Sequence, residues 1–237
     1  MEIHKPKPVH GWREFLSEYA IVVLGVLTAL AAEQSVEWIH WQGEVTAARK
    51  TITAEIQDNN ARYFARRIAV ASCMDRQADE AAQILDELEA GHKTRSFTSF
   101  HIITGSLLSD SEWQSERSAQ SLVHFPRDEL ALMGRYYGQL LVMTPWMEQE
   151  TDAWQALGVL TSPPKNVGVT DILRMRVALG TARRFEQLTV LNSQRQLAIT
   201  AKLGIASQPV DQQLLHKYCT SNDQEYLDFM HSREAHL

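Results

Sequence analysis

The feature that most constrains this chain is an uncharged, largely apolar run near its N-terminus. Fourteen residues without a charged side chain, 19–32, lie between Glu18 and Glu33. As a helix this run is about 21 Å long, shorter than the roughly 30 Å hydrocarbon core of a bilayer. Extending the helix to Phe15 and Val36 gives about 33 Å, with both glutamates near the interfaces, where carboxylates reach headgroups or water. The run therefore predicts a transmembrane helix.

Aromatic and acidic residues mark the expected edges of this helix. Trp12 and Trp38 are separated by about 39 Å of helix, close to the thickness of a bilayer with its headgroups. Tryptophan is enriched at both membrane–water interfaces. We therefore predict an anchor over residues 14–38, with an interface set of Trp12, Glu18, Glu33, Trp38 and Trp41.

Two other interpretations of the run stay open. Basic residues precede it, and Ala29-Leu30-Ala31 fits the small-x-small cleavage site of a signal peptide, so the anchor could be removed after Ala31. Against this, Glu14 and Glu18 lie beside the run, where a signal peptide is usually basic. The third interpretation is a buried helix of a soluble protein. Within the anchor, Gly25 and Ala29 form a small-x-x-x-small pair that could let two anchor helices pack closely.

Flanking basic residues predict the orientation of the anchor. Lys5, Lys7 and Arg13 precede the run, whereas Arg49 and Lys50 come only at the far edge of the relevant window after it. The positive-inside rule then predicts a cytoplasmic segment over 1–13 and a periplasmic domain over 39–237. The expected location is a bacterial inner membrane, with the lipid bilayer as a partner.

The anchor resembles that of an uncharacterised bacterial family of single-pass membrane proteins. The resemblance lies in Glu18-Tyr-Ala-Ile-Val-Val-Leu-Gly-Val-Leu-Thr-Ala-Leu30 followed by Trp38. The family pattern is Glu, an apolar run with Val-x-Gly-Val-Leu-x-Ala-Leu, a Trp, and then a helical domain of unknown function. The Trp comes later here than the family usually has it, and downstream only the pattern of a long polar helix with Ile56 and Asn60 is similar. The resemblance implies a single-pass topology and supplies no activity and no catalytic residue.

After the anchor, apolar residues recur at helical spacing. Only Gly43 interrupts the stretch from Val36 to Asn59, so we expect the anchor helix to continue into the domain and couple to it rigidly. The next helix ends at Gly91 and buries one face, comprising Phe64, Ala71, Met74, Ala78, Ala81, Leu85 and Leu88. A capping box of Ser109 and Glu112 predicts a helix from Asp110 to about His124.

Two further long helices are predicted in the second half. One begins after Pro126, is kinked or broken at Pro145, and buries Leu130, Met133, Tyr137, Leu140 and Leu141. Residues 161–166 form a loop, and a helix capped by Thr170 then runs to Gly204 through Leu173, Val177, Phe185, Leu188 and Leu191. Two short helices start at Pro209 and Ser221. The fold class is all-α: a transmembrane helix followed by an extramembrane bundle of three to four long helices.

Charge and hydropathy exclude some classes of function. Residues 1–32 carry no net charge, so the net charge of −6 belongs to the rest of the chain. Nucleic-acid binding needs a basic face, so we expect no nucleic-acid partner. A mean hydropathy of −0.27 excludes a protein with many spans.

The two cysteines, Cys73 and Cys219, test the orientation. In an exported domain they are expected to form a disulfide that closes a long loop. In a cytoplasmic domain they would instead be two buried thiols.

No pattern predicts an enzyme, a cofactor or a metal site. None of the nine histidines has a spacing that places two ligands on one helix face; His101 and His124 are isolated, and His231 and His236 lie in the tail. The acidic run of Glu148, Glu150 and Asp152 is interpreted as a solvated helix face, and Ser109 and Ser111 as caps rather than nucleophiles.

A set of aromatic residues in the middle third leaves two interpretations open: Trp113, Tyr136, Tyr137, Trp146 and Trp154. They are expected to pack between helices, and a small-ligand pocket is the alternative. The predicted function is a non-enzymatic structural or interaction subunit of a bacterial membrane assembly, with a protein partner or a second copy. The alternative is a periplasmic sensory or small-ligand-binding bundle that signals through a partner.

Overall fold

The computed structural model of the 237-residue chain describes residues 11–92, 95–102, 108–162, 167–207, 209–210, 215 and 219. The chain divides into an N-terminal unit, residues 1–49, and a C-terminal unit, residues 50–237. Each unit is described by itself. The all-α prediction is confirmed, since the described residues contain α-, 3-10 and π-helices and no strand.

The N-terminal unit is built from helix α1 (Trp12–Asn59), whose last ten residues belong to the C-terminal unit. The helix is unbroken at Gly43, as predicted. Its large apolar side chains between Phe15 and Ile39 are exposed. By length and composition this is a helix that can cross a membrane.

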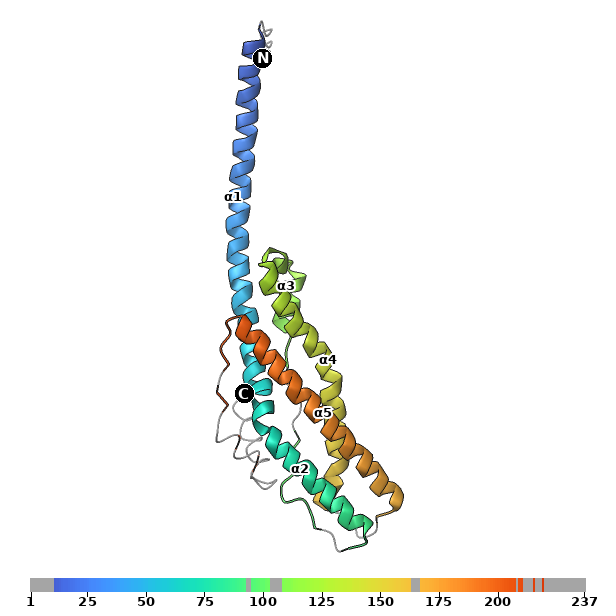
Figure 1. The fold of residues 1–237 in the computed structure, drawn as a ribbon. Helices are drawn as coiled ribbons and strands as arrows, with labels where there is room; N and C mark the ends of the chain where they lie inside the picture. Colours follow the sequence, from blue (N-terminus) through green and yellow to red (C-terminus); the bar gives the residue numbers. More distant parts are fainter. Residues whose placement is uncertain are drawn as a thin grey trace, which may run out of the picture. The chain divides into compact units, whose positions relative to one another are not determined.

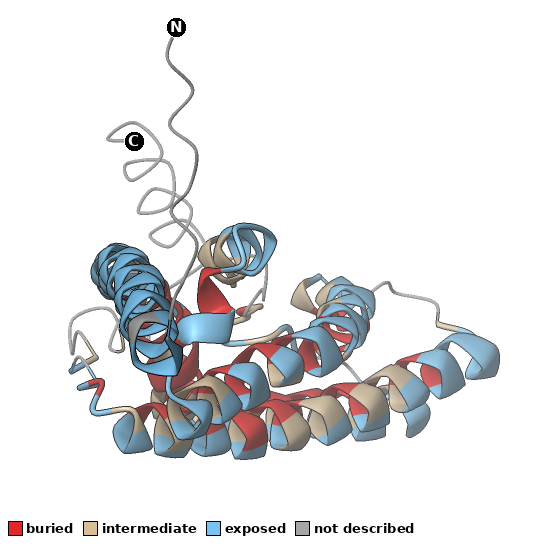
Figure 2. Cartoon of the chain, turned by 90° about the horizontal axis from the view of Figure 1, so that it is seen from above, coloured by how far each residue is buried: buried red, intermediate tan, exposed pale blue. Residues whose placement is uncertain are grey.

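The C-terminal unit consists mainly of three long helices that lie side by side (Figure 1). They are α2 (Ala65–Glu89), α4 (Arg127–Leu157) and α5 (Val169–Lys202). A five-residue π-helical turn, η1 (Asn60–Phe64), joins α1 to α2. Helix α5 packs along both α2 and α4, and the buried residues form stripes along the helices while their other faces are exposed (Figure 2). The predicted bundle of long helices is therefore present.

The predicted face, which runs from the last residue of η1 along α2, is mostly buried. Phe64, Met74, Ala78, Ala81 and Leu85 are buried, whereas Ala71 and Leu88 are half-buried. The helix stops at Gly91, as predicted. Gly91 has a φ of 69°, and the amides of Gly91 and His92 donate to the carbonyls of Leu88 and Glu87. This is the Schellman arrangement, which favours glycine because a residue with a Cβ is strained at positive φ.

Helix α4 begins after Pro126, as predicted, but it does not break at Pro145. Proline cannot donate to the carbonyl of the residue four positions earlier, which is Leu141. Leu141 is 67% exposed, so water can reach this side of the helix. The prediction that Leu141 is buried was therefore wrong, and its exposure gives a physical reason why Pro145 is tolerated.

Helix α5 departs most from the sequence prediction. Its N-cap is Gly168 rather than Thr170. Leu173 and Val177 are 60% and 70% exposed, and Leu191 is exposed as well. The buried face is apolar only in its first half and polar in its second: Ile172, Met175, Leu179 and Ala182, then Glu186, Thr189, Ser193, Gln196 and Thr200. The helix ends with the predicted glycine, Gly204, at a φ of 73°.

The short helix α3 (Ser111–Ser118) is capped from another part of the chain. The predicted capping box is wrong, because the N-cap is Asp110 and it makes no side-chain cap hydrogen bond. Instead, the carboxylate of Glu55 accepts hydrogen bonds from the hydroxyls of Ser109 and Ser111 and from the amide of Glu112 at 2.8–3.0 Å. A negative charge at a helix N-terminus is favourable, so Glu55 does the work that the capping box was expected to do.

Other side chains hold the same segment against α1. The Asn59 amide donates to the Ser109 carbonyl at 2.7 Å and accepts from the Ser109 amide at 2.8 Å. The Tyr137 hydroxyl donates to Glu55 at 2.8 Å. Helix α3 is also shorter than predicted, since a 3-10 turn, η2 (Ser121–His124), follows it. Two short C-terminal helices were also predicted. The one expected to start at Ser221 lies outside the described residues.

Candidate functional site

The predicted membrane-interface residues lie on α1. Trp12 and Trp38 are 73% and 65% exposed, and Glu18 and Glu33 are exposed. Trp41 is half-buried beside His40, with ring centroids 5.3 Å apart. Gly25 and Ala29 are exposed, and a Cβ built on Gly25 would meet no atom within 4 Å. The orienting residues Lys5 and Lys7 lie outside the described residues.

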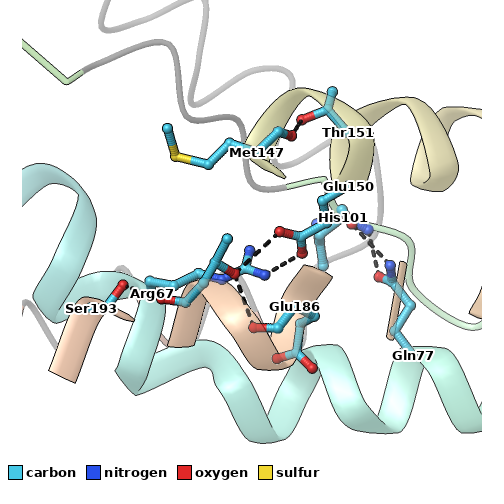
Figure 3. A network of polar contacts seen from close by, with 9 residues as sticks. Arg67, Gln77, His101, Met147, Glu150, Thr151, Glu186 and Ser193 are labelled. Carbon is cyan, nitrogen blue, oxygen red and sulfur yellow. Dashed lines mark hydrogen bonds and ion pairs between the residues drawn. The ribbon is translucent and has the colours of Figure 1, made fainter. Parts of the chain in front are cut away.

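A buried ion pair lies in the core of the C-terminal unit. The guanidinium of Arg67 on α2 donates to the Glu150 carboxylate on α4 (Figure 3), and the two side chains are 0% and 2% exposed. Thr189 on α5 donates to the other Glu150 oxygen at 3.3 Å. Burial acts against the charge of Arg67, but the opposite charge of Glu150 holds the pKa of Arg67 above its ordinary value. The pair therefore connects all three long helices.

Glu186 on α5 adds a second acidic group to this core (Figure 3). Burial raises the pKa of Glu186 to about 7, which Arg67 opposes and Asp75 and Glu150 reinforce. The charged form of Glu186 is therefore disfavoured in this core.

The sequence analysis did not identify this core. Glu150 was interpreted as part of a solvated acidic face, which is wrong, although its neighbours Glu148 and Asp152 are exposed. The signal that could have found it is the position of Glu150 in the α4 pattern. Met147 follows Met143 by four residues and Glu150 follows Met147 by three, so Glu150 lies on the buried stripe. Arg67 likewise follows the buried Phe64 by three residues, which places it on a buried stripe.

The polar half of α5 is held by backbone and side-chain partners. Gln196 donates to the Tyr136 carbonyl at 3.0 Å, and Asn60 donates to the Thr200 hydroxyl at 3.2 Å. Ser193 donates to the carbonyl of Thr189 at 2.7 Å. Buried polar groups need such partners, because an unpaired one costs about 1–3 kcal/mol. The second half of α5 can therefore face the core without apolar residues.

Cys73 and Cys219 are joined by a disulfide in the structure, with Cα atoms 5.5 Å apart. Beside the bond lies a cavity of about 210 Å³ lined by residues of α2 and of the segment 98–101: Cys73, Met74, Arg76, Gln77, Glu80, Thr98, Ser99, His101 and Cys219. Nη2 of Arg76 lies 3.4 Å from the Cys73 sulfur.

Segment 95–102 is fastened to α2 at the wall of this cavity. The Gln77 amide donates to the His101 carbonyl at 2.9 Å and accepts from the His101 amide at 2.7 Å. Glu80 accepts from the amide and the hydroxyl of Thr98 at 2.9 and 2.7 Å. His101, which seemed isolated in the sequence, is buried by these contacts.

The predicted aromatic set falls into two groups. Trp113 stacks on Tyr137 with centroids 4.8 Å apart, and Tyr136 meets Tyr137 edge-on at 5.1 Å. Trp154 instead packs against Phe100 at 6.2 Å. Trp146 is half-buried. These rings fill the spaces between elements, which is the first of the two interpretations of the sequence.

Catalytic and metal-binding candidates are not brought together in the described part of the chain. Within it, no group of three or more histidine, cysteine or carboxylate residues is placed to hold a metal ion. Ser109 and Ser111 donate to Glu55. His231 and His236 lie outside the described residues.

Removing the Glu150 carboxylate should leave a buried cation without its partner. We expect Glu150→Ala to lower the free energy of unfolding of the full chain in detergent by about 3–5 kcal/mol. Glu148→Ala, an exposed position on the same helix, should change it by less than about 0.5 kcal/mol. A combined Arg67→Met and Glu150→Leu variant should recover most of the loss, since an apolar pair carries no desolvation cost. Equal effects of the two single alanine variants would contradict the ion-pair account.

The raised pKa of Glu186 should make the stability of the domain depend on pH. The folded value of about 7 exceeds the ordinary 4.5, so the folded chain holds a proton that the unfolded chain releases. The contribution is complete below pH 4.5 and is lost as the pH rises through 7. Glu186→Gln should match the parent chain at pH 5 and exceed it at pH 8 by about 1–2 kcal/mol, allowing for solvent screening, in urea unfolding. An offset that is the same at both pH values would show that Glu186 does not titrate in this range.

Comparison with known proteins assigns the chain to no family. No protein-family model, curated protein or solved structure matches it. The resemblance of residues 18–38 to an uncharacterised bacterial family of single-pass proteins stays a prediction.

Proposed function

We propose that this chain is a single-pass protein of the bacterial inner membrane that exposes a helical domain in the periplasm. The domain acts as a non-enzymatic structural or interaction subunit of a membrane assembly. The observation that carries the proposal is the exposed apolar stretch of α1, taken together with the disulfide of the C-terminal unit.

The apolar stretch supports a membrane location on energetic grounds. Its side chains are exposed around the helix, including Ile21, Leu24 and Leu27. Transfer of one such side chain from water to an apolar medium is favourable by about 1.5–3 kcal/mol. A helix with apolar residues all round needs either a protein core or a bilayer around it. Among the described residues, none of the 18 that form the most apolar stretch of this helix is buried, which favours the bilayer.

The disulfide supports the periplasmic side. Disulfides persist in oxidising compartments such as the bacterial periplasm and are rare in the cytosol. This one joins residues separated by 146 positions, and closing such a loop stabilises the fold by about 5 kcal/mol in chain-entropy models. It agrees with the orientation that the basic residues before the anchor predict.

The interaction role is supported by the way the domain uses its polar and aromatic groups. Arg67, Glu150 and Glu186 are enclosed among helices, and the aromatic rings pack on one another. The cavity beside the disulfide, at about 210 Å³, is smaller than the 300–1,000 Å³ typical of small-ligand pockets. These features favour a binding subunit over the sensory, small-ligand alternative.

Charged substitutions in the anchor should release the protein from the membrane. On insertion scales each arginine at the centre of a span costs about 2.5–3.5 kcal/mol. We therefore expect Leu24→Arg with Leu27→Arg to move most of the protein into the soluble fraction after cell lysis. Leu173→Arg with Val177→Arg is the matched control, since these apolar residues are also exposed but lie on α5. Membrane retention of the anchor variant would overturn the proposal of a transmembrane anchor.

The orientation is tested by protease treatment of spheroplasts. The proposal predicts that external protease digests the domain while a tag fused at the N-terminus stays protected. Lysed spheroplasts, in which both parts are accessible, provide the control. Full protection of the domain in intact spheroplasts would place it in the cytoplasm and overturn the periplasmic assignment.

A further inference from the structure

The cavity beside the disulfide carries an inference that does not depend on the proposed function. Both cysteines line it, and both are half-buried rather than enclosed in the core. A disulfide that closes a long loop can be stabilising without being reachable by a reagent. Here the bond lies at a cavity wall, so an attacking group can approach the sulfur atoms.

A cation lies beside one of the two sulfurs, that of Cys73. Nη2 of Arg76, one helical turn after Cys73 on α2, lies 3.4 Å from the Cys73 sulfur. A neighbouring guanidinium stabilises a thiolate and lowers the pKa of the thiol. In thiol–disulfide exchange the sulfur with the lower thiol pKa leaves faster. Arg76 therefore favours Cys73 as the leaving sulfur, which leaves Cys219 as the sulfur that is attacked.

The size of the cavity restricts what can enter. A volume of about 210 Å³ is below the usual range of pockets for metabolites and drugs. A single cysteine side chain, presented by a small thiol or by an exposed loop of a protein, is of the right scale. Its walls include the polar side chains of Gln77, Glu80 and Ser99.

We propose that Cys73–Cys219 is a site of thiol–disulfide exchange, opened by a reduced protein dithiol of the Cys-x-x-Cys class. The thiolate of the dithiol attacks the Cys219 sulfur, the bond between Cys219 and Cys73 breaks, and Cys73 leaves as a thiolate beside Arg76. The second thiol of the donor then loses its proton and attacks the donor sulfur of the mixed disulfide. Cys219 is released as a thiol, and Cys73 takes up a proton from water.

The exchange is a two-electron reaction. Two electrons pass from the dithiol, which is oxidised to a disulfide, to the Cys73–Cys219 bond, which is reduced to two thiols. Opening removes the covalent link between the middle of α2 and the C-terminal segment that carries Cys219. The hydrogen bonds of Gln77 and Glu80 to segment 95–102 do not involve the sulfurs, so this wall of the cavity can remain.

The first experiment identifies which sulfur is attacked. The oxidised full chain in detergent is treated briefly with glutathione as a monothiol probe, quenched with acid, alkylated and analysed by peptide mass spectrometry. We expect the glutathione adduct on Cys219 and the alkylated thiol on Cys73. An excess of adduct on Cys73 would overturn the assigned direction.

The second experiment measures the contribution of Arg76 and uses dithiothreitol as the dithiol probe. At neutral pH, Arg76→Gln should slow reduction of the folded chain roughly three- to tenfold, because the leaving thiolate loses its cation. Arg76→Lys should restore most of the rate. Arg174→Gln, an exposed arginine on α5 that does not line the cavity, should leave the rate unchanged.

Two outcomes would overturn the proposal. One is an unchanged rate in Arg76→Gln. The other is reduction only through unfolding, recognised by a rate that does not rise with reagent concentration and equals the unfolding rate measured in parallel by fluorescence. Rates that increase linearly with dithiothreitol under native conditions support direct attack at the cavity.

Discussion

The C-terminal unit depends on a positive charge that has no access to water. Arg67 is completely buried, and the desolvation of an unpaired guanidinium would cost several kcal/mol. Its Nη2 is paired with Glu150, while Nε and Nη1 have no hydrogen-bond partner among the described residues. The stability of such an ion pair depends strongly on how the helices are aligned. The carboxylate on the neighbouring helix must lie level with the guanidinium along the helix axis. The ion pair therefore favours the observed register of α4 against α2, and Thr189 on α5 donates to the same carboxylate.

A second polar junction fixes the start of the domain. Glu55 and Asn59, one turn apart near the end of α1, receive or donate the hydrogen bonds that hold Ser109 and the first turn of α3. Burial opposes the charge of Glu55, but its hydrogen bonds from the Glu112 amide, Tyr137 and the serines prevail and lower its pKa. Polar contacts thus hold the bundle at two places, the Arg67–Glu150 pair and the Glu55–Asn59 turn. Apolar side chains of α2, α4 and α5 pack between and around these contacts.

The sequence predicted the helices better than their faces. Helix ends marked by Gly91 and Gly204 were correct, since a positive φ at the C-terminus is a local requirement that glycine meets. The face of α2 was also largely correct, because its buried residues are mostly apolar. The face of α5 was wrong because apolar residues were taken as buried. Leu173 and Val177 are exposed, while Glu186 and Gln196 are buried, and Gln196 donates to a carbonyl on α4.

The features of the candidate site were also predictable only in part. The apolar run of the anchor and the presence of two cysteines can be read directly from residue order, because they depend on composition and count. Capping of α3 by Glu55 could not be predicted from the capping pattern, since the true partner is more than fifty residues away. The position of Glu150 on the apolar stripe of α4 could have indicated its burial, but its partner Arg67 lies 83 residues away on another helix.

The sequence by itself determined that this chain is helical, that one segment is apolar enough to span a membrane, and where several helices end. These properties arise from hydrophobicity and from backbone preferences that act over a few residues. The tertiary structure alone determines which polar groups are buried, and that Glu55 rather than a local side chain caps α3. Burial and electrostatic pairing depend on distances between helices, and residues far apart in the chain come close only when the helices pack.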